Sequence, residues 1–256
     1  MATYSIRTIA LCEGPRDKSM YTYRMNIGTI CNTVCYVWYI EGSDPKILID
    51  AGANALTFTK RGAEESDIMS IEDGLTKLDL KPEDIELVIV THMHCDHMAL
   101  SHLYKNARFI VQKEEFDYAK DPHPIDAHLF ENNFEELELE LIDGQKEIIP
   151  GLSVFPTPGH TPGGQSVEVD TRLGNAVIPG FCCLSDTFSQ TEEMKHMGWE
   201  VAVPLIHHDI RKLYDSVVAV KQRADIVIGN HDPAYMSKEA IPQKAIVIVS
   251  KGKVLQ

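Results

Sequence analysis

Four side chains of metal-binding type lie within six positions of the sequence: His92, His94, Asp96 and His97. They directly follow an apolar run at residues 85–90, which is typical of a buried strand. Two residues that are two positions apart in an extended chain project to the same side, as His92 and His94 would. Imidazole nitrogens and carboxylate oxygens are suitable ligands for zinc. We therefore expect the histidine pair to face one ion, and Asp96 with His97 to face a neighbouring one.

Three more residues of this kind occur later in the chain, each near the end of an expected strand: His160, Asp186 and His231. Prolines stiffen the loop at residues 156–164 that carries His160, and glycines let it turn tightly. The two oxygens of the Asp186 carboxylate could bridge two cations. Any one of these residues alone is more typical of a loop or a packed core. Together with the first cluster they predict two adjacent metal sites.

Alternating strand-like and helix-like segments are expected to hold these side chains in place. Residues 34–40 and 46–50 are apolar and flank a turn at 42–45, which predicts a hairpin. Ser70 and Asp209 are candidate N-caps of helices. Further strands are expected at residues 85–90, 152–155, 166–169, 176–178, 226–228 and 245–249. The acidic, irregular stretch at residues 120–140 would join the two halves of the chain.

The composition limits the class of partner. The chain has 256 residues and a formal charge of −14, from 38 acidic and 24 basic residues. Such a surface repels phosphate backbones and anionic lipids, so we expect a small-molecule partner, with no nucleic acid and no membrane. The sequence shows no signal-like N-terminal segment and no apolar run long enough for a membrane span, which predicts a cytoplasmic protein.

The six cysteines form no disulfide framework and no C-x-x-C pair, so we interpret them as reduced thiols. Cys95 lies among the candidate ligands, but its neighbours already complete the motif. We therefore interpret Cys95, Cys182 and Cys183 as small packed thiols.

The seven candidate ligands, in this order, resemble the metallo-β-lactamase superfamily over essentially the whole chain. The loop at residues 157–163, the following Gln165 and Ser166, and the segment 230–232 are most similar to the N-acyl-homoserine lactonases. The resemblance implies a single α/β domain over residues 1–256. Its fold would be a four-layer αββα sandwich of two pseudo-symmetric halves, roughly 1–135 and 136–256.

The resemblance also implies a ligand set. His92, His94 and His160 would hold one ion, Asp96, His97 and His231 the other, and Asp186 would bridge them. Asp50 matches an aspartate that supports the ligands from behind, although a strand-end aspartate that caps a turn is an equally good interpretation. The ions are expected to be two Zn²⁺, with Fe or Mn as alternatives, and a homodimer is implied at the family level.

The activity implied is that of a metal-dependent hydrolase. A hydroxide shared by the two ions would open a small cyclic ester, amide or imide, with Asp96 as the catalytic proton carrier. The chain departs from the lactonases at Ser189, where they have a tyrosine, and at Gly164, where many relatives have a histidine. We interpret Phe188, Ser189, Trp199 and Tyr23 as candidate substrate-binding residues. Tyr21, on the same loop as Tyr23, is a further candidate.

Three other functions share the motif. A glyoxalase II-like thioesterase is disfavoured by the strand-like end of the chain, because those enzymes have a basic helical C-terminal region. A di-iron oxygen reductase is disfavoured by His94, where such proteins typically have glutamate. A non-catalytic, ligand-binding member of the superfamily would be expected to have lost some of the ligands, and here every position is filled.

Overall fold

Two β-sheets form the centre of the molecule in this computed structural model, which describes residues 2–130, 134–238, 240–241, 248–250 and 253–255. The first sheet has the strand order β13 (Ala240–Ile241), β1 (Ser5–Asp17), β2 (Ile30–Glu41), β3 (Ile47–Ile49), β5 (Leu87–Ile89), β6 (Arg108–Gln112) and β7 (Glu138–Ile142), and β4 (Ser66–Asp67) pairs with β1. The second sheet has the order β15 (Lys253–Leu255), β14 (Ile248–Ser250), β12 (Ile226–Val227), β11 (Gly174–Ile178), β10 (Gln165–Thr171), β9 (Leu152–Pro156) and β8 (Lys146–Ile149).

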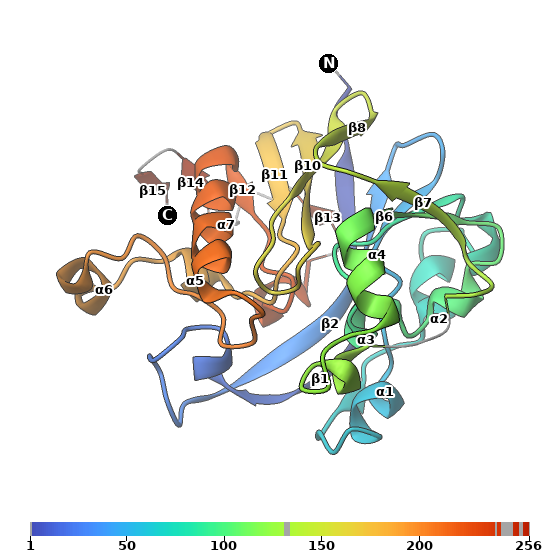
Figure 1. Ribbon diagram of the computed structural model, residues 1–256. Helices are drawn as coiled ribbons and strands as arrows, with labels where there is room; N and C mark the ends of the chain where they lie inside the picture. The colour runs from blue at the N-terminus through green and yellow to red at the C-terminus, as the bar shows by residue number, and fades with distance from the viewer. Residues whose placement is uncertain (1, 131–133, 239, 242–247, 251–252, 256) are drawn as a thin grey trace.

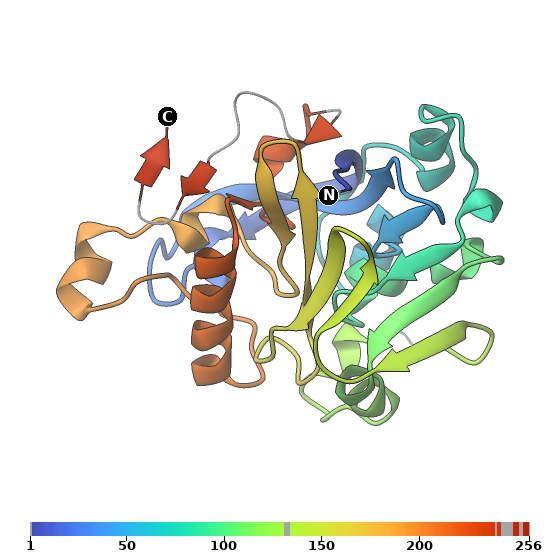
Figure 2. The same ribbon diagram turned by 90° about the horizontal axis from the view of Figure 1, so that it is seen from above.

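The two sheets pack face to face, and helices cover their outer faces (Figures 1 and 2). A shared core lies between the sheets, with Ile49 and Ile89 from the first packed with Val167 and Ile178 from the second. Helices α2 (Ile71–Thr76) and α4 (Lys113–Lys120) contribute to a second core on the outer face of the first sheet. Helix α7 (Ile210–Arg223) packs Leu213, Val217 and Val220 against the second sheet. The order of layers is therefore helix, sheet, sheet, helix, as expected.

The remaining helices are short: α1 (Ala55–Thr59), α3 (Cys95–Met98), α5 (Ser185–Phe188) and α6 (Glu192–Met197), with 3-10 turns η1 (Lys18–Met20), η2 (Pro82–Asp84), η3 (Ser101–Leu103), η4 (Ala127–Leu129) and η5 (Pro233–Tyr235). Within the described part of the chain, no helix has the length and apolar character needed to cross a bilayer.

Several local predictions are confirmed. Strands β2 and β3 pair antiparallel around the predicted turn. Ser70 accepts a hydrogen bond from the backbone of Asp73 and begins α2, and Asp209 accepts from Arg211 and Lys212 and begins α7. In each case a short polar side chain satisfies backbone N–H groups that the first helical turn leaves unpaired.

The path between the sheets differs from the expectation. Residues 138–142 form β7 at the edge of the first sheet, within and beyond the stretch expected to be irregular. The chain passes to the second sheet between β7 and β8, and β13 later returns to pair with β1. Of the strand expected at 245–249, residues 245–247 lie outside the described residues, and 248–250 form β14.

Strand direction brings the candidate ligands together. In the first sheet β3 and β5 are parallel, so Asp50 and the segment 91–97 leave the sheet at one edge. In the second sheet β9 and β11 run in the same direction because both are antiparallel to β10, and β12 is parallel to β11. The loops after β9, β11 and β12 therefore also meet at one edge.

Candidate metal centre

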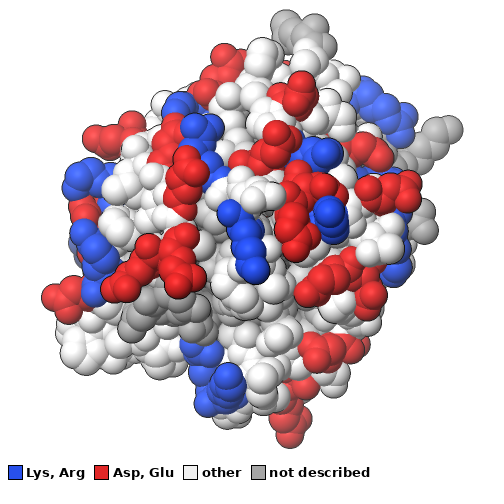
Figure 3. Space-filling model, turned by 90° about the vertical axis from the view of Figure 1, so that its right-hand side faces the viewer, with Lys and Arg blue, Asp and Glu red and all other residues white. Residues whose placement is uncertain are grey.

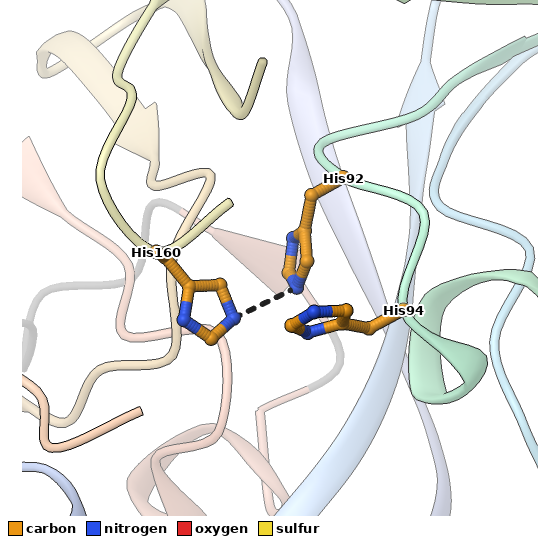
Figure 4. Close-up of side chains that lie close together, drawn as sticks. All are labelled: His92, His94 and His160. Atoms are coloured by element: carbon orange, nitrogen blue, oxygen red, sulfur yellow. Dashed lines mark hydrogen bonds between the residues drawn. The ribbon is translucent and has the colours of Figure 1, made fainter. Parts of the chain in front are cut away.

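Three histidines from both sheets form the first cluster (Figure 4). His92 and His94 come from the turn between β5 and α3, and His160 comes from the loop between β9 and β10. All three are buried, and one ligand nitrogen of each lies within 4.8 Å of the others. Nε2 of His92 lies 3.1 Å from Nε2 of His160. Two nitrogens that bind one tetrahedral zinc ion at ordinary bond lengths are about 3.3 Å apart, so this spacing fits a shared ion.

The second cluster lies beside the first. Oδ2 of Asp96 is 3.2 Å from Nε2 of His97 and 3.5 Å from Nε2 of His231. His97 is 3% exposed, and its Nε2 makes no hydrogen bond of good geometry despite the nearby carboxylate. A buried polar nitrogen without a partner is costly unless another group satisfies it. The donor set and this orphaned nitrogen both fit a second cation.

In four of these histidines, Nδ1 lies within hydrogen-bond distance of an oxygen atom of the protein. Nδ1 of His97 lies 2.7 Å from Oδ2 of Asp50, and Nδ1 of His92 lies 3.1 Å from Oγ1 of Thr91. Nδ1 of His160 lies 2.7 Å from the carbonyl oxygen of Ile206, and Nδ1 of His231 lies 3.1 Å from that of Val34. Such contacts fix the ring orientation and leave Nε2 free to bind metal.

Asp50 connects the two ligand-bearing segments of the first sheet. Its Oδ1 accepts the backbone N–H of Thr91 (2.7 Å) and its Oδ2 accepts the Thr91 hydroxyl (2.9 Å), in addition to the contact with His97. Its backbone has φ = 62°, in the left-handed region that aspartate tolerates better than most residues. The side chain is 1% exposed, so this carboxylate is fully committed to holding the ligand turn.

Burial and mutual repulsion keep most of the imidazoles neutral, as metal ligands must be. Burial lowers the pKa of His160 and of His231 to about 4, and burial together with neighbouring histidines lowers the pKa of His92 and of His94 well below the ordinary value. His97 is the exception: burial opposes its charge, but Asp96 and Asp50 outweigh that effect and raise its pKa to about 10. A cation between His97 and Asp96 would take the place of that proton.

The side chain of Asp96 is ionised at neutral pH. Burial alone would raise its pKa, but His97 and His231 outweigh burial and hold the pKa of Asp96 well below its usual range. An ionised carboxylate beside two imidazoles is a suitable ligand set for a divalent cation.

A pocket of about 220 Å³ opens onto both clusters. His94, Asp96, His160 and His231 line its base, and its walls include Arg16, Tyr21, Phe58, Arg61, Glu65, His128, Leu129, Cys182 and Ile206. The ring of Tyr21 lies 6.1 Å from that of His231. Arg16 and Glu65 form an ion pair in this wall.

The structure does not bring Asp186 to this pocket. Its side chain is 53% exposed, and Oδ2 forms an ion pair with Nζ of Lys18 at 2.7 Å. The turn after β11 ends in α5, which directs the carboxylate to the surface in this structure, and the bridging role of Asp186 stays a prediction. Cys182, which we interpreted as a packed thiol, packs with Tyr21 and Leu184 and also lines the pocket, with Sγ 3.3 Å from Nε2 and 3.7 Å from Nδ1 of His160. Its place shortly after a strand end was the signal available in the sequence.

The four predicted substrate residues lie elsewhere. Phe188 is buried in the core beneath α7, and Ser189 is exposed, with its hydroxyl donating to the carbonyl oxygen of Ser185. Tyr23 and Trp199 line a separate, mainly apolar pocket of about 310 Å³ beside α7. None of the four lines the histidine pocket, whereas Tyr21, the further candidate on the same loop as Tyr23, does.

Comparison with known proteins supports a relationship over most of the chain. An N-acyl homoserine lactonase of Bacillus cereus is 27% identical over 235 residues, which cover 84% of this chain and 88% of that protein. Among solved structures, an N-acyl homoserine lactone hydrolase with the product N-hexanoyl-L-homoserine at its catalytic metal centre matches with a TM-score of 0.72, at 21% identity, over 92% of this chain and 96% of that one. A dizinc quorum-quenching lactonase, AidC, matches with a TM-score of 0.66 and 14% identity, over 97% of this chain and 92% of that one.

The curated homologues are thus hydrolases, N-acyl homoserine lactonases among them, and the solved structures share the fold. The sequence profile described as the metallo-beta-lactamase superfamily matches residues 32–180, which include five of the seven predicted ligands. With its histidine-rich turn at the edge of a two-sheet sandwich, this chain belongs to the metallo-beta-lactamase superfamily.

Proposed function

We propose that this protein is a dinuclear metal-dependent hydrolase that opens a small cyclic ester, amide or imide. The observation that carries the proposal is the convergence of two ligand trios on one pocket. His92, His94 and His160 form the first trio. Asp96 and His97, whose ligand atoms also lie within 4.8 Å of one of His92, form the second trio with His231, whose Nε2 is 3.5 Å from Oδ2 of Asp96. When bound, a pair of divalent cations makes a coordinated water acidic and polarises a carbonyl oxygen.

The protein contributes orientation and proton transfer. The Nδ1 contacts of the histidines hold the imidazoles in place before substrate arrives, which avoids reorganisation during the reaction. Two carboxylates line the pocket, and Glu65 is engaged by Arg16. Asp96 is then the carboxylate that carries a proton from the attacking water to the leaving group.

The size of the pocket favours a small substrate. At about 220 Å³ it lies below the usual range of drug-sized ligand sites, roughly 300–1,000 Å³. Acidic and basic side chains are interspersed on the face shown in Figure 3, which does not resemble the basic surface of a nucleic-acid-binding protein. A small ring whose carbonyl reaches the base of the pocket fits these constraints.

The related lactonases make lactones the first substrates to examine, and the remaining choice lies among ester, amide, imide and thioester. Zinc is the proposed ion because imidazole-rich sites favour it, with iron or manganese as alternatives.

The test combines metal analysis with a substrate panel. Purified protein would be assayed before and after chelation on lactones, cyclic imides, thioesters and phosphodiesters, with bound metal quantified in parallel. We expect two ions per chain, ring-opening activity that is lost on chelation, and recovery with Zn²⁺. Activity that survives complete metal removal would overturn the proposal. Preferential cleavage of thioesters would replace it with the thioesterase hypothesis.

Replacing Asp96 with asparagine tests the proton-transfer role. The Asp96→Asn variant keeps an oxygen in the pocket but cannot accept a proton at pH 7. We expect a fall in kcat of about 10²–10⁴-fold with a much smaller change in KM. Because Asp96 is also a proposed ligand, bound metal must be measured in the same samples. An unchanged kcat would remove Asp96 from the mechanism.

A further inference from the structure

Two free thiols face each other behind the ligand turn. Cys12 on β1 and Cys35 on β2 lie directly opposite in the antiparallel pairing of these strands. A β-bulge between Ala10 and Cys12 sets this register. Without the bulge Leu11 would be the partner of Cys35, and Cys12 would project to the other face of the sheet. The bulge therefore brings together two cysteines that a regular ladder would separate.

The spacing of the two strands suits a disulfide. Directly opposed residues of an antiparallel pair have Cα atoms about 4.5–5.5 Å apart, and disulfides join Cα atoms that are about 4.4–6.8 Å apart. Both thiols are buried in one small cluster with Ala53 and Ala55. A hydrogen bond between the two side chains is the largest of the causes that raise the pKa of Cys35. The two sulfur atoms are thus neighbours before any bond forms between them.

Each thiol also holds a segment of the candidate metal centre. The thiol of Cys35 donates to the carbonyl oxygen of Asp96, with Sγ at 3.1 Å. The thiol of Cys12 donates to the carbonyl oxygen of Ala53, with Sγ at 3.6 Å. A disulfide has no S–H group to donate, so its formation would remove both contacts.

The segment that Cys12 holds positions the ligand turn. The backbone N–H groups of residues 51 and 52 donate to the carbonyl oxygen of His97 at 2.8 and 3.1 Å. Asp50, directly before them, holds the imidazole of His97 through Nδ1. A change at the cysteine pair therefore reaches the second trio from both sides, through Asp96 and through His97.

A small oxidant can reach one of the two sulfur atoms. Cys35 lines the pocket of about 220 Å³ at the candidate metal centre, whereas Cys12 is 0% exposed behind it. Cys35 is thus the thiol that an oxidant meets first, and Cys12 is placed as the thiol that resolves the product. Because the pKa of Cys35 is raised, its thiolate is scarce at neutral pH, and we expect the oxidation to be slow.

We propose that Cys12 and Cys35 form a reversible disulfide, with a hydroperoxide as oxidant, and that this bond loosens the ligand turn. The bond itself does not depend on the proposed function, but its effect on metal binding rests on the proposed metal centre. Cys35 gives up its proton and its sulfur attacks one peroxide oxygen; the O–O bond breaks and one water leaves. The sulfur of Cys12 then attacks that of Cys35; the S–O bond breaks and a second water leaves with the Cys12 proton.

Mass spectrometry tests the bond. The full-length protein would be treated with hydrogen peroxide, its remaining thiols alkylated, and the protein digested without reduction. We expect the number of free thiols to fall from six to four, with peptides joined through Cys12 and Cys35. Fragmentation must distinguish Cys35 from Cys31, which lies on the same strand. A dithiol reductant should restore all six thiols.

Three single substitutions provide controls. Cys35→Ala and Cys12→Ala suit the cluster that already contains two alanines, and each should abolish the joined peptides. Either variant is sufficient if the other fails to fold. Cys31→Ser removes the partly exposed thiol of β2, which lies opposite Arg16, and should leave the joined peptides unchanged.

Metal affinity tests the consequence. The Kd for Zn²⁺ would be measured by competition with a chromophoric chelator, for reduced and for oxidised protein. We expect the disulfide to weaken Zn²⁺ binding about 10-fold, the lower end of the usual cost of losing a contact behind a ligand. The dithiol reductant should restore the original Kd. Cys35→Ala should have the same Kd before and after peroxide treatment.

The outcomes separate this proposal from the proposed function. Six free thiols after peroxide treatment, or a loss confined to Cys182 and Cys183, would overturn the disulfide. A disulfide that leaves the Kd for Zn²⁺ unchanged would overturn its effect on the ligand turn. Wild-type protein that binds no Zn²⁺ in either state would overturn that effect and the proposed function together. A reversible disulfide that weakens Zn²⁺ binding, in a protein that hydrolyses nothing in the panel, would support this proposal and overturn the proposed activity alone.

Discussion

At the scale of single residues, Asp50 determines how well the ligand turn is prepared for metal. It holds Nδ1 of His97 and both polar groups of Thr91. Asp50→Asn would keep the size of the side chain but lose the negative charge beside His97. We expect metal affinity to fall about 10- to 100-fold, the usual cost of losing a partner behind a ligand. Competition with a chromophoric chelator would measure it.

Asp186→Asn is the matched control for that experiment. The carboxylate of Asp186 is paired with Lys18 at the surface, where such pairs contribute little. We expect metal affinity and stoichiometry equal to those of the wild type. A loss of metal in this variant comparable to that of Asp50→Asn would contradict the placement of Asp186.

The buried histidines make the metal-free protein sensitive to acid. The pKa of His160 and of His231 is lowered to about 4 in the folded state from an ordinary value of 6.5. Between these values the unfolded chain binds more protons, so the free energy of unfolding decreases as pH falls from about 6.5 to about 4.

Urea denaturation of the chelated protein at a series of pH values would measure this decrease. The slope should be shallower in His231→Asn, which removes one of the titrating groups. A free energy of unfolding that stays constant over this window would refute the interpretation.

The residues of the site differ in how well the sequence alone predicts their positions. His92, His94, Asp96 and His97 were predictable because a single turn carries all four. The positions of Cys182 in the pocket and of Asp186 at the surface were not, since both residues follow β11 within a few positions. They depend on Asn230 and Lys18, which hold this segment from distant parts of the chain. Tyr21 and Tyr23 pose the same problem, because a short loop decides which ring enters the pocket.

At the scale of elements, α4 connects the two loops that carry the first trio. Oε1 of Glu115 accepts the backbone N–H of Met93 (2.8 Å), and Oε2 accepts that of Gly163 (3.1 Å). The fit is close: a Cβ atom at position 163 would lie 2.0 Å from the backbone nitrogen of Glu115, so only glycine fits there. The helix therefore fixes the distance between the turn with His92 and the loop with His160.

Removing this side chain tests the connection. Glu115→Ala leaves two buried N–H groups unpaired, at a cost of about 1–3 kcal/mol each, and should weaken metal binding together with stability. Glu115→Gln keeps one acceptor oxygen and should have an intermediate effect. Thermal denaturation with and without Zn²⁺ would show both. Glu114→Ala, at an exposed neighbouring position, is the control and should behave as the wild type.

The elements differ in how far their own sequence determines them. Ser70 and Asp209 mark helix starts through local hydrogen bonds, so a short stretch of sequence was enough to predict them. Strand β7 was missed although residues 138–142 alternate acidic and apolar side chains, which is a strand pattern. These residues begin within the acidic stretch expected to be irregular, and pairing with β6 makes them the edge of the sheet. The return of β13 to the first sheet likewise depends on a long-range pairing, with β1.

At the scale of the whole molecule, the candidate metal centre draws its residues from both sheets. The segment 91–97 belongs to the first sheet, whereas His160 and His231 follow strands of the second. An ion that binds only the folded state stabilises it by mass action, by about 2.7 kcal/mol at a free concentration 100 times the Kd. We expect Tm to rise with Zn²⁺ and to fall on chelation.

Hydrogen exchange would locate this effect. Chelation should speed exchange at residues 157–164 and 229–232, the loops that bring histidines from the second sheet, while the strands between the helical layers stay protected. Equal exchange of those loops with and without Zn²⁺ would contradict a joint between the sheets.

The walls of the pocket have a different origin from its base. The proposed ligands come from residues 92–97, 160 and 231, whereas Arg16, Phe58, Arg61, His128 and Leu129 belong to segments that supply no proposed ligand. If the proposed function holds, the residues that bind metal and the residues that contact substrate are encoded in separate stretches of the gene. Mutation can reshape the entrance while the reactive machinery is preserved, so relatives with the same ligand turn need not share a substrate. Directed evolution of new selectivity should begin in the segments around residues 16, 58–65 and 128–129.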